Sequence, residues 1–220
     1  MHPITLYNEA LYLLPQKGIW WPTQKMLIIS DTHFGKTGHF RKMGIAVPQP
    51  AFKNDMHRFT SMIVNFHVES VVIVGDMFHS YENKEADFFI RWRHDLPWLR
   101  IHLVRGNHDI LPLQWYNRAA IELHEADNFC IHPFRFVHDV PNVTPSGDQY
   151  LFSGHVHPAI ALKGKARQHL KLPCFLFRND YAVLPAFGNF TGNVAIKFER
   201  NDRVFAIANN DIIPIEKYRS

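Results

Sequence analysis

Five short apolar runs in this sequence each end at aspartate, asparagine or histidine. The runs are MLIIS from Met26, VVIVGD from Val71, IHLVRGNHD from Ile101, FRFVHD from Phe134 and YLFSGHVH from Tyr150. Short apolar runs bounded by polar residues and glycine are typical of buried strands. The sequence therefore predicts a covered sheet with polar side chains at the ends of its strands.

The segments between the first three runs predict helices that lie on this sheet. Apolar residues recur at spacings of three and four in the first segment, at Phe52, Met56, Phe59, Ile63 and Phe66. The stretch EADFFIRWRHDLPW, residues 85–98, has a similar spacing. Alternating strands and helices imply right-handed βαβ crossovers and a parallel core.

The second half of the chain reads differently. After about residue 120 the helical spacing fades, and FCIHPFRFVHD, CFLFRNDYAVLP, NVAIKFER and VFAIANNDIIPIE read as consecutive strands with N-D and G-N turns. A chain of 220 residues with 46% hydrophobic content can bury a sizeable core. We therefore predict an α/β fold, with residues 1–220 forming one domain of two β-layers flanked by helices.

Metal-ligating side chains follow every one of the five runs. In chain order they are Asp31 and His33, Asp76, Asn107 with His108 and Asp109, His138, and His155 with His157. Because α/β sheets bind ligands outside the carboxyl ends of their strands, we expect these side chains to meet in one cavity. In D-T-H and H-V-H, an extended backbone would point both outer residues to the same side. Oxygen and imidazole ligands without sulfur suit manganese, iron or zinc.

Each of these residues has an ordinary explanation when it is taken alone. A single Asp31 or Asp76 is more often a turn residue or a helix N-cap, and a single His138 is more often a surface or core histidine. The same explanation holds for the remaining histidines that we considered, His102, His124, His132 and His169. Turn chemistry does not explain five successive strand ends that all carry such residues, so the joint pattern predicts a metal site.

The composition narrows the class of protein. Lysine and arginine exceed aspartate and glutamate by 24 to 20, which is compatible with an anionic partner. Cys130 and Cys174 lie far apart, so neither a disulfide framework nor a thiolate zinc site is indicated. The sequence has no run of about 18 uncharged apolar residues and no signal-peptide pattern at its start. We therefore expect a cytoplasmic protein without a membrane partner.

The ordered set D-x-H, G-D, G-N-H-D, a further histidine and G-H-x-H resembles the calcineurin-like metallophosphoesterase superfamily from Leu27 to His157. The resemblance implies a four-layer α/β/β/α sandwich, with two mixed β-sheets flanked by helices. It also implies two divalent metal ions, for which manganese is expected and iron or zinc also fit. The implied ligands are Asp31, His33 and His157 for one metal, Asn107, His138 and His155 for the other, and Asp76 for both.

The resemblance also implies catalytic roles. His108 would be the general acid for the leaving oxygen, and Asp109 would orient its imidazole and raise its pKa. His132 is a rival to His138 as a ligand, and we prefer His138 because it closes an apolar strand, whereas His132 precedes a proline. Two divalent cations with two carboxylates would leave the centre positively charged, as a phosphate substrate requires.

A narrower resemblance covers nearly the whole chain. The segments SDTHFGKTGHFRKMGIAVP, GDMFHS, VRGNHD, SGHVHPA and LPAFGNFTG resemble the bacterial DNA ligase-associated metallophosphoesterases. This group implies a short strand pair before the first metal loop, and a phosphodiesterase or nuclease that acts on DNA in repair. It implies a DNA ligase, a helicase and a nuclease-like protein as partners. The chain could also form a homodimer. Trp20 and Trp21, which we expect to be exposed, could join its interface or simply cover the sheet edge.

Basic residues follow the first metal loop, namely Lys36, His39, Arg41 and Lys42. Lys36, Arg41 and Lys42 are candidates for binding phosphates beside the scissile one. These basic residues could equally well lie in the solvent-exposed first turn of a helix. In FGNFTG, Gly188 and Gly192 predict a tight loop near the metals.

Three functions fit these observations. The favoured one is a metal-dependent DNA phosphodiesterase or endonuclease in a ligase-associated repair system. The second is a hydrolase of small phosphomonoesters or nucleotides, which a compact chain without a capping domain also suits. The third is a non-catalytic, metal-containing scaffold of a repair complex. The presence of His108 and Asp109 beside a full ligand set favours an enzyme, because a structural metal site needs no general acid.

Overall fold

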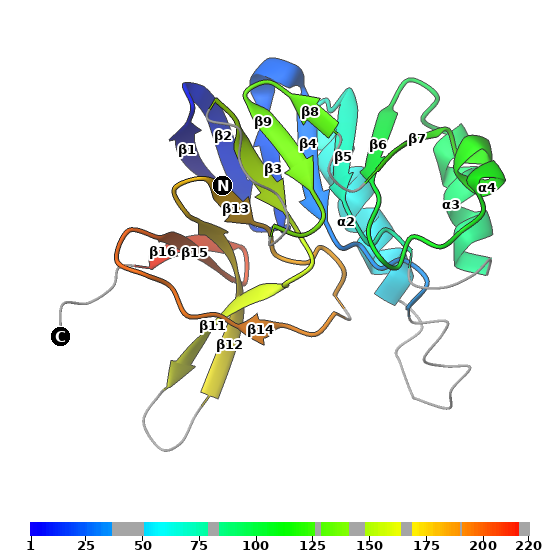
Figure 1. Cartoon of the computed structure of the whole chain (residues 1–220). Coiled ribbons are helices and arrows are strands. Elements are labelled where there is room, and N and C mark those ends of the chain that lie inside the picture. The colour runs from blue at the N-terminus through cyan, green and yellow to red at the C-terminus, as the bar shows by residue number, and fades with distance from the viewer. Residues whose placement is uncertain are drawn as a thin grey trace.

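The computed structural model describes residues 1–36, 51–78, 84–125, 129–140, 148–163, 169–189 and 191–215. These residues form two mixed β-sheets that face each other, with α-helices gathered on one side of the pair (Figure 1). The predicted α/β fold with two mixed sheets is confirmed.

The first sheet has seven strands in chain order. They are β1 (His2–Leu6), β2 (Glu9–Leu14), β3 (Gly18–Trp21), β4 (Met26–Ser30), β5 (Ser70–Val74), β6 (Arg100–Val104) and β7 (Ile121–His124). β1 to β4 are antiparallel neighbours, whereas β4 to β7 are parallel. The antiparallel β1 and β2 form the strand pair that the narrower resemblance implied, and β4 to β6 form the predicted parallel core.

The α-helices of the described residues cover the outer face of this sheet. They are α2 (Ala51–Asn65), α3 (Lys84–His94) and α4 (Leu113–Arg118), and a 3-10 helix η1 (Pro22–Gln24) precedes β4. α2 and α3 are the two predicted helices. Sequence periodicity missed α4 because six residues are too few to show it, although it buries Trp115 and Tyr116.

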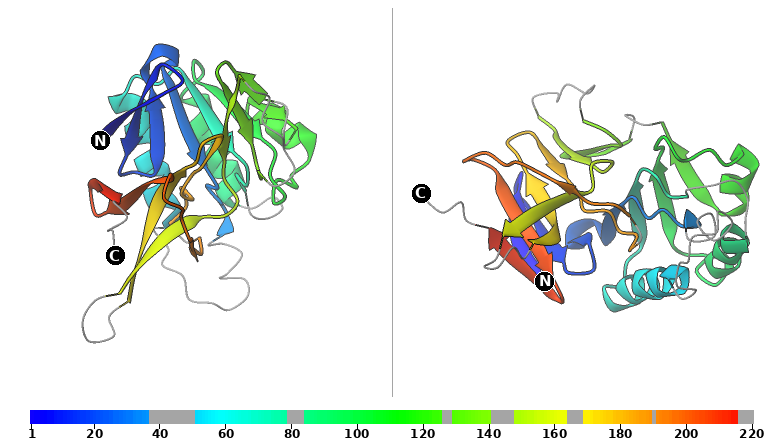
Figure 2. Two further views of the ribbon diagram at one scale, coloured as in Figure 1. Left: turned by 60° about the vertical axis from the view of Figure 1, so that its left-hand side comes forward. Right: turned by 90° about the horizontal axis from the view of Figure 1, so that it is seen from below.

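The second sheet has nine strands, in the order β14-β11-β12-β13-β10-β9-β8 with β15 and β16 added beside β12. They are β8 (Phe129–Ile131), β9 (Phe134–Val137), β10 (Tyr150–Ser153), β11 (Pro158–Lys163), β12 (His169–Phe177), β13 (Tyr181–Val183), β14 (Val194–Ala195), β15 (Arg203–Ala208) and β16 (Asp211–Ile215). β9, β10 and β13 are parallel. One end of the β11–β12 hairpin extends beyond the rest of the second sheet (Figures 1 and 2).

Helices flank only the first sheet in the described part of the chain, so the predicted outer helical layer on the second sheet is not seen there. That face carries a small apolar cluster around Ile160, Leu176 and Val204, against which other residues of the same half of the chain pack, among them Phe198 and Ile215. The outer face of the second sheet, for which the sequence predicted helices, is thus covered by strands and by the extended chain after β14.

Aromatic side chains fill the space between the two sheets. Trp21 from β3 meets Phe134 from β9 edge-on with ring centroids 4.8 Å apart, and Phe134 in turn lies 5.0 Å from Phe152. Burying each ring contributes on the order of 2–3 kcal/mol to folding. Trp21 is fully buried and its Nε1–H donates to Glu9, so the expectation that it is exposed is wrong. Trp20 packs on the helical side of the sheet against Phe66.

Two other observations concern membrane-spanning helices and disulfide bonds. No helix within the described ranges is long and apolar enough to cross a membrane. Cys130 and Cys174 are both free, so no disulfide joins them.

Candidate metal centre

The polar residues at the strand ends meet in two adjacent clusters. Asp31, His33 and His157 form one, and Asp76, His138 and His155 form the other, with the ligand atoms of each cluster within 4.8 Å of one another. The aspartates and His33 follow β4 and β5 of the first sheet, whereas the other histidines follow β9 and β10 of the second. The carboxyl ends of parallel strands from both sheets therefore build the site together.

The first cluster brings two imidazoles and a carboxylate to one point. His33 Nε2 lies 3.3 Å from His157 Nε2, which lies 3.5 Å from Asp31 Oδ1. Such a set of lone pairs suits a divalent transition metal.

The second cluster is built around His138. Its Nε2 lies 2.9 Å from Asn107 Oδ1 and 3.1 Å from His155 Nδ1. Burial lowers the pKa of His138, against the opposing charges of Asp76 and Asp31. The imidazole is therefore kept neutral, which is the form that binds a metal.

Asp76 lies between the two clusters. Its Oδ2 is 3.9 Å from His33 Nε2 in the first, and its Oδ1 is 3.6 Å from His138 Nε2 in the second. The backbone N–H of His108 also donates to Oδ1 at 2.9 Å. With one oxygen directed to each cluster, Asp76 has the position that the resemblance implied for a shared ligand.

The backbone that carries these side chains is left-handed, not extended. Positive φ angles of 44° to 65° occur at five of the cluster residues, Asp31, His33, Asp76, His155 and His157. The prediction that D-T-H and H-V-H are extended is therefore wrong, although the outer residues do meet. A left-handed conformation costs roughly 1–2 kcal/mol for each non-glycine residue, and such strain is typical of functional sites.

The glycines of the strand-end motifs leave space for the ligands. An added Cβ would lie 1.8 Å from His138 Nδ1 at Gly75, 2.3 Å from Asp76 Oδ1 at Gly106, and 2.4 Å from Asp31 Oδ2 at Gly154. Each glycine thus lets a ligand from a different loop pack directly against the backbone.

The segment from Leu184 to Gly192 fastens the first metal loop to the second sheet. Phe187 N–H donates to Ser30 O at 2.8 Å and Gly188 N–H donates to Asp31 O at 3.2 Å. A Cβ at Gly188 would lie 2.5 Å from Thr32 O, so this close approach requires glycine. Around Gly192 a Cβ would meet nothing within 4 Å, so its glycine serves no steric need there.

The carbonyl of Gly192 instead orients a ligand. It lies 2.9 Å from His157 Nδ1, which can donate its proton there and leave the Nε2 lone pair directed into the first cluster. Burial alone would lower the pKa of His157. The hydrogen bond and negative charge of Asp31, together with the Gly192 carbonyl, outweigh this effect, so the pKa is raised.

Helix α2 holds the same segment from behind. Asp55 accepts hydrogen bonds from the Asn189 backbone and side-chain nitrogens and from Arg58 Nη2. Arg58 also donates to Asn189 Oδ1 and to Phe187 O, and its guanidinium lies 4.1 Å above the Phe187 ring centre. Sequence analysis missed these residues because they act through contacts between segments about 130 positions apart.

Comparison with known proteins fits this arrangement. No family model and no curated protein matches the sequence. Among solved structures, the Pseudomonas putida nuclease MPE matches with a TM-score of 0.82 and 28% sequence identity, over 97% of this chain and 99% of the nuclease. The two-sheet fold and this match fit the metallophosphoesterase superfamily that the sequence resembles. The match is consistent with the narrower resemblance to the ligase-associated group.

His108 stands beside the first cluster. Its ring centre lies 5.7 Å from that of His33, in an edge-on arrangement. The carboxylate of Asp109 accepts hydrogen bonds from backbone N–H groups of Gly106, Met77 and Phe78. Asp109 therefore ties together the loops after β5 and β6. Its role in orienting the His108 imidazole stays a prediction.

The charge state of Asp109 depends on competing effects. Burial raises the pKa of Asp109 to about 7, although the three N–H donors lower it. Cations bound at the neighbouring clusters would lower it further, because they favour the carboxylate form.

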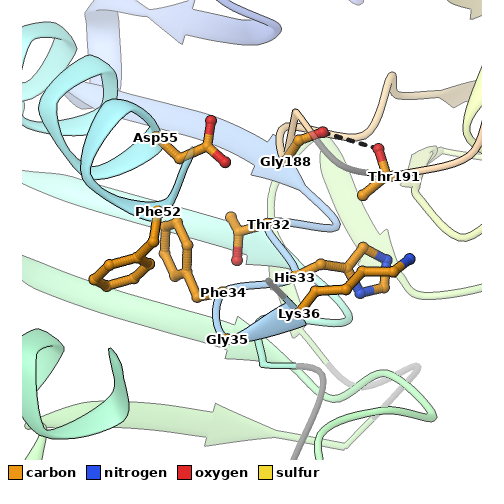
Figure 3. A pocket seen from close by; sticks show the side chains of 9 residues that line it. All are labelled: Thr32, His33, Phe34, Gly35, Lys36, Phe52, Asp55, Gly188 and Thr191. Atoms are coloured by element: carbon orange, nitrogen blue, oxygen red, sulfur yellow. Dashed lines mark hydrogen bonds between the residues drawn. The ribbon is translucent and has the colours of Figure 1, made fainter. Parts of the chain in front are cut away.

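Lys36 is the predicted phosphate-binding residue that the structure describes. It lines a narrow pocket with Thr32, His33, Gly188 and Thr191, in which the His33 and Lys36 side chains extend the same way (Figure 3). Burial lowers the pKa of Lys36, whereas the charge of Asp76 raises it. The other candidates, His39, Arg41 and Lys42, lie outside the described residues.

Three of the other histidines that the sequence analysis considered, His102, His124 and His132, lie apart from the paired clusters. His132 is exposed, whereas His138 is buried within the centre, so the structure favours His138 as the ligand. His102 and His124 belong to a third cluster, together with Glu122. The aromatic residues Phe34 and Phe187 are buried in the core.

Proposed function

We propose that this protein is a metallophosphoesterase, namely a binuclear metal-dependent nuclease that hydrolyses phosphodiester bonds in DNA. The observation that carries the proposal is the position of Asp76, with one carboxylate oxygen directed to each of two His-rich clusters. The full-length similarity to a bacterial nuclease supports phosphodiesters as the substrate class.

Seven side chains would hold the two metals, for which manganese is our first choice. They are Asp31, His33 and His157 on one side, Asn107, His138 and His155 on the other, and Asp76 between them. Metals held there would lower the pKa of a water and polarise the phosphate oxygens. The donor set of imidazoles, carboxylates and one amide fits such ions.

The remaining residues would bind and protonate the substrate. Lys36 would attract the phosphate, because its ammonium is close enough to interact with both Asp76 and His157. His108 would give a proton to the leaving oxygen. Asp109 and the backbone N–H of His108 would hold that histidine's loop in place.

Hydrolysis with added Mn²⁺ tests the proposal. The substrates are single-stranded DNA, duplex DNA, a chromogenic phosphodiester and a chromogenic phosphomonoester. Asp76→Asn removes the central carboxylate charge, and Asp95→Asn is the matched control at an exposed position of the α3 C-terminus. We expect DNA and diester cleavage by the wild type and by Asp95→Asn, and none by Asp76→Asn.

Other results would redirect the assignment. Turnover of the monoester alone would favour a hydrolase of small phosphates, and the absence of any metal-dependent activity would favour a scaffold. The partnership with a DNA ligase, a helicase and a nuclease-like protein stays a prediction, which co-purification from cells would test.

A further inference from the structure

A third group of metal-ligating side chains lies on the faces of two strands, away from the strand-end loops. It consists of His102 on β6 with Glu122 and His124 on β7, and it shares no residue with the paired clusters. His102 is directly opposite Glu122 in the parallel register, and His124 follows two positions later. Because side chains alternate along a strand, all three project from the same face of the sheet. We refer to these three residues as the edge cluster.

The spacing of their ligand atoms matches a metal site. His102 Nδ1 lies 3.2 Å from His124 Nε2 and 3.2 Å from Glu122 Oε2. Tetrahedral zinc with bonds of about 2.0–2.1 Å to nitrogen and oxygen requires its ligands to be about 3.3 Å apart. The ligand atoms of all three residues lie within 4.8 Å of one another, so they can bind one small cation after a small movement.

The two imidazoles are held in place by an aromatic neighbour. The ring of Phe129, at the start of β8, stacks on His102 with centroids 4.7 Å apart and on His124 with centroids 4.1 Å apart. Arg105 N–H donates to His124 O at 2.8 Å and so fixes the backbone of β7 at this point. Preorganised rings lose little conformational entropy when they bind a ligand.

The protonation and exposure of the edge cluster also suit a cation. Burial lowers the pKa of both His102 and His124, so the imidazoles are neutral near pH 7. Glu122 supplies a negative charge with a side chain that is 57% exposed, whereas His102 is only 12% exposed. One side of the cluster is thus open to solvent, which gives an ion both a route of entry and a position for water.

We propose that His102, Glu122 and His124 form a separate site for one zinc-class divalent cation, with an open coordination position toward solvent. Two imidazoles and one carboxylate favour such borderline transition metals over Mg²⁺ or Ca²⁺, which prefer oxygen ligands. The ion would clamp β7 to β6, the strand that leads directly into the loop with Asn107 and His108. This site does not depend on the proposed nuclease activity.

Zinc binding to the full-length protein tests this proposal. Chelator-treated protein is dialysed against Zn²⁺, and the bound metal per chain is measured for the wild type, His124→Gln and Glu122→Gln. We expect the wild type to bind one more zinc ion than His124→Gln. Glu122→Gln should weaken the binding of that ion by at least about 10-fold.

The matched control is His57→Gln, which removes an exposed histidine from α2. It should bind as much zinc as the wild type. Because Glu122 is exposed, Glu122→Gln should fold as the wild type does, and circular dichroism of each variant verifies the fold. Equal zinc content and affinity in the wild type, His124→Gln and Glu122→Gln would overturn the proposal.

Discussion

The paired clusters and the edge cluster use the same kinds of side chain on different kinds of backbone. Ligands of the paired clusters stand on loops in left-handed conformations, with glycines against which other ligands pack. Residues of the edge cluster stand on regular strands, where the register alone brings His102 beside Glu122. Backbone strain therefore marks the paired clusters, whereas the edge cluster needs no strain to form.

The two regions also differ in what supports them. Hydrogen bonds from several elements hold the paired clusters, including the backbone N–H of His155, which donates to Asp31. The edge cluster is supported by the stacked ring of Phe129 and by the Arg105 N–H, which donates to His124 O. We therefore expect substitutions near the paired clusters to affect activity strongly, and substitutions at the edge cluster to affect metal content alone.

The largest effect is expected for His108→Ala. Loss of a general acid lowers kcat by about 10³-fold, within the usual range for such groups. The measurement is diester or DNA hydrolysis with saturating Mn²⁺, together with the metal content of the variant. Metal bound at the paired clusters should be unchanged, because the ligand side chains are intact.

Two controls sharpen this first comparison. His132→Ala removes an exposed histidine, and His124→Gln removes an edge-cluster ligand; both should retain kcat within about 3-fold, since neither residue is near the paired clusters. A kcat for His108→Ala close to that of the controls would assign proton transfer to another group.

The next effect is a loss of fold and metal binding in Gly75→Ala. The new methyl group would meet the His138 ring, and the residue has φ of +75°, so both overpacking and a strained backbone oppose it. We expect a loss of about 3 kcal/mol in the free energy of unfolding, measured by urea denaturation. Gly192→Ala is the control, because its Cβ would meet nothing within 4 Å.

How much of this could be read from the sequence depends on how local each signal is. The strand ends at Asp31, Asp76 and His155 were visible because each apolar run stops at its ligands. Helix α2 was visible because its apolar residues are regularly spaced. These features need only neighbouring residues, so the sequence predicted the parallel core and the residues of both paired clusters.

Features that depend on contacts between distant segments were not visible. The edge cluster needs the register of β6 against β7, and β7 itself was not predicted, so His102 and His124 looked like ordinary histidines. The carbonyl of Gly192 carries no side-chain signal at all. Similarly, the absence of helices over the second sheet in the described residues follows from how its own strands pack, which periodicity does not reveal.

A smaller effect is expected for Arg58→Gln. This substitution removes the charge that faces Asp55 and the donors that hold Asn189 and Phe187, so the segment behind the first metal loop loosens. We expect about 2 kcal/mol of destabilisation, typical of lost hydrogen bonds to a charged group. The first cluster should bind metal about 10-fold more weakly. Arg91→Gln, at an exposed position of α3, should have neither effect.

The smallest effect concerns Lys17, which faces the same network. Burial lowers the pKa of Lys17 to about 8 from its ordinary value of 10.5, with a further lowering by Arg58 and an opposing effect of Asp55. Between these two pKa values the unfolded chain binds more protons than the folded chain, so the contribution of Lys17 to stability rises with pH. Below about pH 8 Lys17 is protonated in both the folded and the unfolded chain, so the free-energy cost of burying its charge does not change with pH.

Lys17→Met should remove this dependence. The wild type should gain about 1–2 kcal/mol relative to Lys17→Met between pH 7.5 and 10, a value reduced from the full pKa difference because the side chain is partly exposed. Urea denaturation of both proteins across this range measures the difference, and other groups that titrate there cancel. A constant difference would mean that the Lys17 ammonium is solvated in the folded protein, and that the network behind the metal loop consists of Asp55, Arg58 and Asn189 alone.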